Sequence, residues 1–216
     1  IFVGSYDGIH VLKRFNGVWQ YTNKITGFDI SARHMEMVND NEILISHEYN
    51  GVYHVTLSDD LDQVENVRVL NVKRGRHASL IKFNDEVYYM SPDGFFTFDK
   101  QLNDFLPHSI SSAMFANDFY LSGKMILDER NRIWTFFEKN IVLLEKNIFD
   151  SSFSIQKIPI HNDYRKTNLG FENISEQNNN TYLLGTMNGF LNIKLNNYEV
   201  PQAKLFLSRA TSSALD

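Results

Sequence analysis

The sequence has no cysteine and only four prolines among its 216 residues. Without cysteine, disulfides, thiolate nucleophiles and cysteine-ligated zinc sites are excluded. The chain also has no apolar run of about 18 residues, the length that a membrane-spanning helix needs, and no basic-then-apolar leader at its start. Because Ile1 is not an initiator methionine, we expect a processed chain or an excised piece, with any signal or anchor lying outside it.

Basic residues and helical periodicity are also scarce. The 21 Lys and Arg residues are outnumbered by 26 Asp and Glu residues, giving a formal net charge of −5, which argues against a nucleic-acid-binding surface. No helix-period pattern lasts for three turns. By contrast, the 17 Phe and 10 Tyr residues are typical of half-buried strands. We therefore expect an all-β chain that binds no nucleic acid.

One short hairpin pattern occurs five times: an apolar run, three or four polar residues, a Gly or Asn pivot, and a second apolar run. The pivots, separated by 43, 43, 46 and 49 residues, are Gly8, Gly51, Gly94, Asn140 and Gly189. A repeat of about 40 to 50 residues indicates a β-propeller of four-stranded antiparallel blades. We expect type I′ turns with positive φ at both central residues, and a distorted or longer turn at Lys139-Asn140.

Apolar segments on either side of the hairpins complete each blade. Those before the hairpins predict inner strands, and the more polar ones after them predict outer edge strands. The inner strands are expected at 34–38, 78–83 and 124–127, and the outer strands at 18–21, 64–70 and 153–160. The long segment 102–121 is expected to hold an edge strand followed by a loop between blades.

The two ends do not complete a set of blades. The chain opens in a second strand, and the last repeat has three strands. We therefore expect residues 1–198 to form blades of which the first and last are incomplete, as the C-terminal part of a larger propeller; a self-contained five-blade ring is the alternative. Residues 199–216 are expected to be an exit strand or the start of a following domain, with the outer strand of the last blade as the alternative.

Three segments resemble a known family: Tyr182–Phe190, Asp128–Trp134 and Val200–Arg209. The first two resemble the two-component regulator propeller repeat of bacterial sensor proteins. The third is similar to the entry of the immunoglobulin-like triple-tyrosine domain that commonly follows such propellers. Only the last copy keeps Gly-Thr, only the fourth has the Trp, and the fourth lacks the pivot Gly.

The resemblance implies a periplasmic or otherwise extracytoplasmic sensor region of a membrane-anchored protein. It implies that the remaining blades and a triple-tyrosine domain belong to the same chain, and that the output is a cytoplasmic histidine kinase or a DNA-binding regulator. The ligand is not identified, with a saccharide or an anionic compound as the candidates, and homodimer formation is an open alternative.

Two Arg-His pairs stand out independently of the resemblance. Arg33-His34 and Arg76-His77 are 43 residues apart, and each His stands 17 residues before its pivot. The pairs are therefore predicted to occupy equivalent places at the start of two successive inner strands. Because Arg offers a planar fork of donors and His a titratable partner, they are candidates for binding an anionic or polyhydroxylated ligand. The alternatives are loop side chains that pair with nearby Asp or Glu, or the remnant of a repeat signature.

Other candidate sites are weaker, and we expect no metal and no cofactor. His47 and His54 have no third ligand at suitable spacing, which favours a surface or edge-strand role. The acidic run Asp59–Asp62 lacks the Gly and the later Glu of a calcium loop, so a solvated turn is expected. Strand alternation sends the members of aromatic pairs such as Tyr88-Tyr89 to opposite faces, which favours core packing over a stacking platform. The second such run is Phe95, Phe96 and Phe98.

Signatures of catalysis are absent: there is no Gly-x-Ser-x-Gly elbow, no glycine-rich phosphate loop and no His-Glu-x-x-His. We therefore interpret the chain as a non-catalytic sensor region that binds a ligand or a partner domain. The alternative is a propeller scaffold for protein–protein interaction. A propeller enzyme acting on polysaccharide ranks third, because fold alone does not fix function.

Overall fold

The computed structural model describes residues 1–72, 77–164, 169–178 and 180–195. The prediction of an all-β chain is confirmed: the described residues form five antiparallel sheets of three or four strands, with one short α-helix and one 3-10 helix. None of these sheets closes on itself. The segment 199–216, predicted to be an exit strand or the start of another domain, lies outside the described residues.

The sheets follow one another in chain order. The first comprises β1 (Phe2–Ser5), β2 (Gly8–Phe15) and β3 (Val18–Lys24). The second comprises β4 (His34–Met37), β5 (Glu42–His47), β6 (Gly51–Leu57) and β7 (Val64–Val69). The third comprises β8 (Ser79–Phe83), β9 (Glu86–Ser91), β10 (Gly94–Asp99) and β11 (Asp104–Pro107). The fourth comprises β12 (Tyr120–Leu127), β13 (Arg132–Phe137), β14 (Asn140–Lys146) and β15 (Phe153–Pro159), and the fifth β16 (Ile174–Asn178), β17 (Thr181–Thr186) and β18 (Gly189–Lys194).

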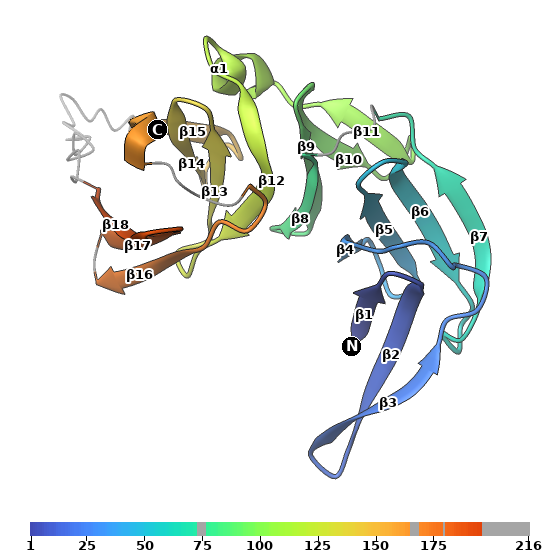
Figure 1. Ribbon diagram of the computed structural model, residues 1–216. Helices are drawn as coiled ribbons and strands as arrows, with labels where there is room; N and C mark the ends of the chain where they lie inside the picture. The colour runs from blue at the N-terminus through green and yellow to red at the C-terminus, as the bar shows by residue number, and fades with distance from the viewer. Residues whose placement is uncertain (73–76, 165–168, 179, 196–216) are drawn as a thin grey trace, which may run out of the picture.

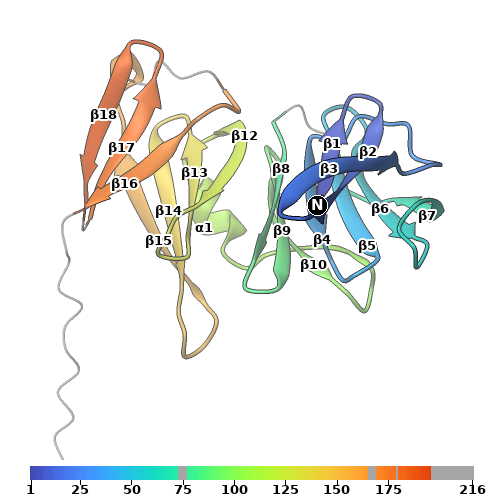
Figure 2. The ribbon, with the colours of Figure 1, turned by 90° about the horizontal axis from the view of Figure 1, so that it is seen from below.

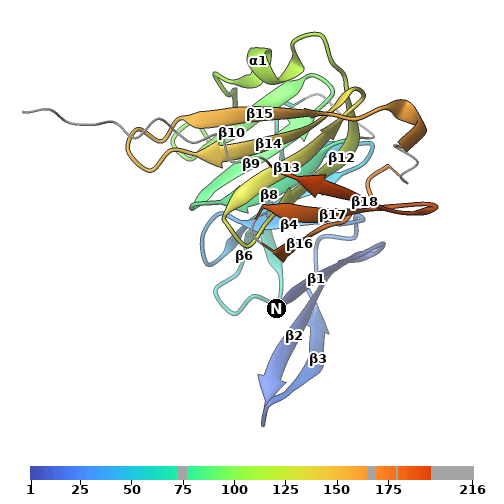
Figure 3. The same cartoon turned by 90° about the vertical axis from the view of Figure 1, so that its left-hand side faces the viewer.

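The five sheets lie side by side along a curved path (Figures 1 and 2). The strands in each sheet pair in sequence order. Strands β4, β8 and β12 are on the inner side of the curve, where β8 contacts both of the others. The turn between β2 and β3 projects away from the other sheets (Figure 3).

Four hydrophobic cores occupy the spaces between consecutive sheets. In β13, Ile133 and Phe137 pack against the third sheet, whereas Trp134 and Phe136 pack against the fifth. This division follows from the two-residue period of a strand, which directs successive side chains to opposite faces. The other two cores join the first sheet to the second and the second to the third in the same way. Each internal sheet is therefore buried on both faces.

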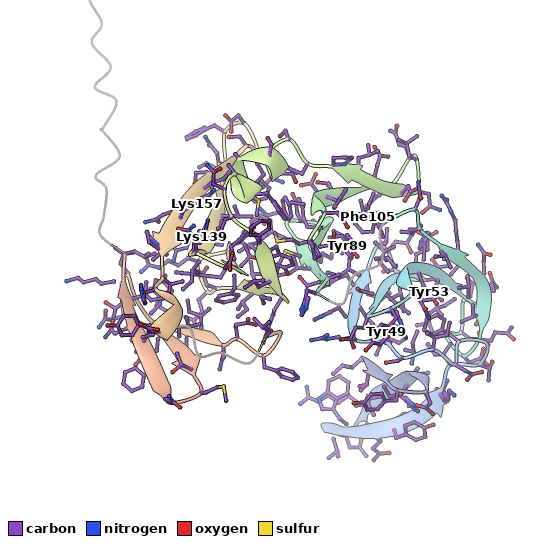
Figure 4. All side chains as sticks on the ribbon, turned by 45° about the horizontal axis from the view of Figure 1, so that its top comes forward. Tyr49, Tyr53, Tyr89, Phe105, Lys139 and Lys157 are labelled. Atoms are coloured by element: carbon purple, nitrogen blue, oxygen red, sulfur yellow. The ribbon has the colours of Figure 1, made fainter. Side chains whose placement is uncertain are left out.

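The aromatic pair Tyr88-Tyr89 belongs to these cores and not to a surface platform. Tyr88 packs in the core between the third and fourth sheets, and Tyr89 in the core between the second and third. Tyr89 contacts Phe105 with ring centroids 5.4 Å apart (Figure 4). Phe95 stacks on Tyr88 at 5.2 Å. Phe96 and Phe98 take part in the core on the Tyr89 side.

The prediction of type I′ turns at the pivots is wrong. In the third hairpin, Pro92 and Asp93 form the turn, and Gly94 pairs with Ser91 as the first residue of β10. The proline ring fixes φ near −65°, so Pro92 cannot take the positive φ that a type I′ turn requires. Gly94 takes a φ of +148° instead. The other glycine pivots also have a positive φ. The values are +132° at Gly8, +93° at Gly51 and +145° at Gly189.

The turn at Lys139-Asn140 is neither longer nor shifted in register, contrary to the prediction. Strand β13 ends at Phe137 and β14 begins at Asn140, and their pairing runs without a shift. The buried carboxylate of Asp118 accepts hydrogen bonds from Lys139 N (2.9 Å) and Asn140 Nδ2 (2.7 Å). This carboxylate stabilises the turn without a glycine at the pivot.

A buried network explains the motif Asp128–Trp134. Asp128 Oδ1 accepts from the backbone N–H groups of Arg130 (3.0 Å) and Arg132 (2.9 Å), which closes the turn before β13. Its Oδ2 accepts from Arg132 Nε (3.0 Å) and Trp134 Nε1 (2.9 Å). Arg132 also bonds to the hydroxyl of Tyr182 in the fifth sheet. One carboxylate therefore links a turn, a buried cation and an indole N–H.

The segment 102–121, predicted to be an edge strand and a loop, contains β11 and also helix α1 (Ser111–Phe115). Two lysines of the fourth sheet hold the end of this helix (Figure 4): Lys157 Nζ donates to Ala116 O (3.3 Å) and Lys139 Nζ to Asn117 O (3.1 Å). The other helix, η1 (Asn162–Tyr164), has three residues. Neither of these helices is long and apolar enough to cross a membrane, among the residues that the structure describes.

Candidate functional site

A cavity of about 720 Å³ is lined by residues of the first, second and fourth sheets and by the segments that lead into the second, third and fifth sheets. The contributions include Tyr6 from the β1–β2 turn, His47 at the end of β5, His77 before β8, Ser122 in β12 and Phe171 before β16. A volume of this size is typical of small-molecule sites. The site is therefore a product of the repeat, because each sheet presents the same end to the same space.

Two of the four predicted site residues, Arg33 and His77, line this cavity. His34 begins β4 but is not among the lining residues. Arg76 lies outside the described residues. The cavity lining thus contains one residue from each Arg-His pair.

Arg33 is exposed and extends toward the segment that leads into the fifth sheet. Its guanidinium lies against Gly170, where an added Cβ would be 2.6 Å from Nη2. Gly170 has a φ of +83°, a conformation that also favours glycine. Among the described residues, none forms an ion pair with Arg33 or accepts a hydrogen bond from it. Its donors are therefore available to a ligand.

Glu172 fixes this same segment to the fourth sheet. The side chain is only 1% exposed, and its Oε2 accepts from Ser122 Oγ (2.8 Å) and Gly170 N (2.9 Å). Lys124 Nζ donates to the backbone carbonyl of Glu172 at 2.7 Å. Phe171 and Leu169, which line the cavity, are therefore held in place by a buried anchor.

The position of His77 depends on a close backbone approach. A Cβ added at Gly123 would be 2.9 Å from His77 Cα, and Gly123 has a φ of +68°. It lies in β12 at an interruption of the pairing with β13, where a bulge re-aims the strand. Glycine at this position allows the fourth sheet to reach the backbone of His77.

His34 is half-buried next to Arg33, and its buried Nε2 has no hydrogen-bond partner among the described residues. Burial, together with the positive charges of Arg33 and Lys124, lowers the pKa of His34 to about 4. The imidazole is therefore neutral near pH 7. It belongs to the packing around β4 and is not placed to donate to a ligand as a cation.

We expect acid to destabilise the fold through His34. The pKa is about 4 in the folded state and about 6.5 in the unfolded chain. Stability is therefore complete above pH 6.5 and falls as the pH decreases toward 4, by about 2 to 3 kcal/mol. Urea denaturation of the wild type and of His34→Gln at pH 7 and pH 4.5 measures this loss. An equal pH dependence in both proteins would contradict the assignment.

Aromatic residues around the cavity were not predicted from the sequence. Tyr6, Tyr49 and Phe171 line it and are 96%, 60% and 71% exposed. A signal was present, because Tyr6 and Tyr49 each stand two residues before a pivot, at Gly8 and Gly51. The repeat register that identified the Arg-His pairs would also have placed these two rings at one end of the blades.

Ser5, Asp7 and His10 lie together at the edge of the cavity without forming a catalytic triad. Ser5 Oγ donates to Asp7 Oδ1, and His10 Nε2 lies 3.1 Å from Ser5 Oγ and 3.0 Å from Asp7 Oδ1. Both contacts use the same ring nitrogen, so His10 cannot relay a proton from Ser5 to Asp7. The hydrogen bonds from Ser5 and His10 hold the pKa of Asp7 well below its usual range.

His54 lines a second cavity, of about 240 Å³, away from the first. Its Nε2 lies 3.6 Å from Glu42 Oε2. Burial lowers the pKa of His54, and Glu42 opposes this shift. In the described part of the chain, no three His, Asp or Glu residues lie together as metal ligands would. The acidic run is stabilised as a turn, with Ser58 Oγ donating to Asp62 Oδ1 at 3.2 Å.

The fold and the cavity define an all-β repeat protein in which successive sheets share one site. No family model matches the chain, and no curated protein matches it significantly. Its fold is similar to that of the extracellular domain of BT4673 from B. thetaiotaomicron, described as a proposed one component system. The match has 15% identity and a TM-score of 0.53, and covers 89% of this chain and 27% of that chain.

A second structure of the BT4673 extracellular domain, described as a proposed hybrid two component system, matches with 15% identity and a TM-score of 0.44. That match covers 90% of this chain and 31% of the other. The resemblance drawn from the sequence is thus confirmed at the level of fold: the structural neighbours are extracellular domains of a bacterial regulator. The present chain spans less than a third of their length.

Proposed function

We propose that this chain is part of a non-catalytic, extracytoplasmic sensor region of a bacterial signal-transduction regulator, and that its cavity binds the signal. One observation carries the proposal: Arg33 and His77, one residue from each of two Arg-His pairs that stand in register in consecutive repeats, line one cavity. Arg33 has no partner among the described residues. An unpaired guanidinium in a cavity of this size suits an anionic or polyhydroxylated ligand, including a saccharide.

We infer that the five sheets are consecutive blades of a larger propeller. Support comes from the four cores, each of which joins one sheet to the next. It also comes from the similar extracellular domain, of which this chain covers 27%. Under this proposal the region is the periplasmic part of a membrane-anchored protein, and its output is a histidine kinase or a DNA-binding domain.

The segment 169–172 offers a route for relaying ligand binding. Leu169 and Phe171 line the cavity, and Glu172 anchors the same segment to Ser122 in β12. A ligand that moves Phe171 would therefore change how the fifth sheet sits against the fourth. Such a change in orientation could be passed to whatever follows the last sheet.

Arg33→Ala is expected to weaken ligand binding about tenfold or more, because hydrogen bonds to charged groups are among the stronger ones. The measurement is titration calorimetry with D-glucuronate and with inorganic sulfate. Because Arg33 is exposed, the melting temperature of ligand-free Arg33→Ala should stay close to that of the wild type. Arg14→Ala, which removes an arginine outside the cavity, is the matched control. Equal affinities for wild type and Arg33→Ala would refute the site.

A protein-interaction scaffold remains the second candidate, supported by one separate feature. Ile148 and Phe149 are 88% and 91% exposed at the turn between β14 and β15. The turn is ordered by hydrogen bonds from Phe149 N to Asn147 Oδ1 (2.9 Å) and from Ser151 N to Asn147 O (3.0 Å). Two apolar side chains held outward in this way favour contact with another protein.

A further inference from the structure

We propose that His47 determines the specificity of the cavity as a fixed hydrogen-bond donor, and that the ligand is a small ring compound carrying an oxyanion such as a carboxylate or sulfate. The inference rests on the proposed function, since it assumes that the cavity holds the ligand. It concerns a residue that the sequence had placed at a surface or strand edge.

The tautomer of His47 is set by the turn that follows it. Its Nδ1 accepts hydrogen bonds from Tyr49 N (3.0 Å) and Asn50 N (3.1 Å). A backbone N–H can only donate, so Nδ1 must carry a lone pair. In the neutral imidazole the proton is then on Nε2. His47 therefore has a donor, and no free acceptor, to offer a ligand.

The orientation of the His47 ring is also fixed. Tyr49 and Tyr53 both meet it edge-on, with ring centroids 6.1 Å and 6.5 Å away; Figure 4 shows these two tyrosines on the same sheet. His47 is half-buried and lines the cavity. A donor held from two directions is organised before any ligand arrives, which favours affinity and selectivity.

The cavity around His47 combines donors with apolar rings. Arg33, which also lines it, can only donate. Among the described residues that line the cavity, Glu48 is the one acid, and it already has an interaction partner. The guanidinium of Arg33 and the Nε2 donor of His47 both favour an acceptor, and an unprotonated oxyanion is the strongest one. The exposed rings of Tyr49 and Phe171 provide flat surfaces on which a ligand ring packs.

The sharpest variant is His47→Asn. Its carboxamide oxygen can accept from the same turn N–H groups, as asparagine commonly does in turns, but the side chain is too short to supply the Nε2 donor. His47→Asn should therefore keep its melting temperature. Its affinity for D-glucuronate or benzoate, measured by titration calorimetry, should fall about tenfold or more. The matched control is His161→Asn, since His161 lies outside the cavity lining.

The probe panel tests the ligand class. D-glucuronate and benzoate distinguish a sugar acid from an aromatic acid. D-glucose and benzyl alcohol lack the anion, and acetate lacks the ring. Tighter binding of either ring carboxylate than of its uncharged counterpart and of acetate supports the proposal. Equal binding of acetate overturns the ring requirement, and equal binding of glucose or benzyl alcohol overturns the anion requirement.

Nitrogen-15 NMR of the wild-type imidazoles tests the tautomer without any ligand. An unprotonated Nδ1 and a protonated Nε2 at His47 support the proposal, and the opposite tautomer overturns it. Unchanged affinity in His47→Asn with lost affinity in Arg33→Ala overturns the role of His47 while the site stands. Absence of binding by every probe to the wild type overturns both.

Discussion

Asp128→Ala should lower the free energy of unfolding by about 3 to 5 kcal/mol, which is the usual cost of removing one partner from a buried ion pair. Arg132 lies 2.9 Å from Asp128 Oδ2, and its side chain is 8% exposed. Trp134 Nε1 would also lose its acceptor, and this residue is fully buried. The variant therefore leaves a buried cation without its counter-ion, with only the Tyr182 hydroxyl as a partner among the described residues, and an indole N–H without an acceptor.

Urea denaturation followed by circular dichroism measures this loss. Asp29→Ala is the matched control: it removes an aspartate that pairs with Lys24 at 2.6 Å on the surface, where the Asp29 side chain is 75% exposed. Exposed pairs contribute about 0 to 1 kcal/mol. A loss below 1 kcal/mol in Asp128→Ala would show that the network is not a principal source of stability. Asp128→Asn, which keeps the shape but not the charge, should give an intermediate value.

Gly8→Ala should destabilise the first hairpin by about 3 kcal/mol or more, because two penalties add. The φ of Gly8 is +132°, a conformation that costs other residues about 1 to 3 kcal/mol. In addition, the new Cβ would lie 2.2 Å from the backbone oxygen of Phe28, so the chain there must move. Phe28 is part of the core between the first and second sheets.

The last repeat supplies a control that separates these two penalties. Gly189 has a similar φ of +145°, but a Cβ added there meets nothing within 4 Å. Gly189→Ala should therefore show the conformational cost alone, about 1 to 3 kcal/mol. If thermal denaturation gave equal losses for the two variants, the close approach to Phe28 would contribute nothing.

The repeat register was the part of the structure most accessible from the sequence. It located the five hairpins, the inner strands and two residues of the cavity, because a two-residue strand period and glycine pivots are local properties. Turn geometry was harder to predict. Pro92 already excluded positive φ in its own turn, and this local conflict identifies the error in the type I′ prediction.

The roles of His34 and His47 depended on contacts that no spacing reveals. His34 looked equivalent to His77, yet it is half-buried with its Nε2 enclosed and lies outside the cavity lining. His47 looked like a surface residue until two backbone N–H groups from its own turn fixed its tautomer. Glu172 is likewise distant in sequence from Ser122, and the two meet where the fifth sheet packs on the fourth.

The position of the cavity has a consequence for how the protein responds to stress. Each sheet packs only on its neighbours, as in other repeat arrays whose stability is a sum of local terms. The terminal sheets are then expected to open before the middle ones. The cavity, however, is lined by residues of the first, second and fourth sheets and by the segments that lead into the third and fifth. Detachment of a single terminal sheet would therefore disrupt the cavity and release its ligand. Ligand binding is then expected to make the unfolding of the array more cooperative.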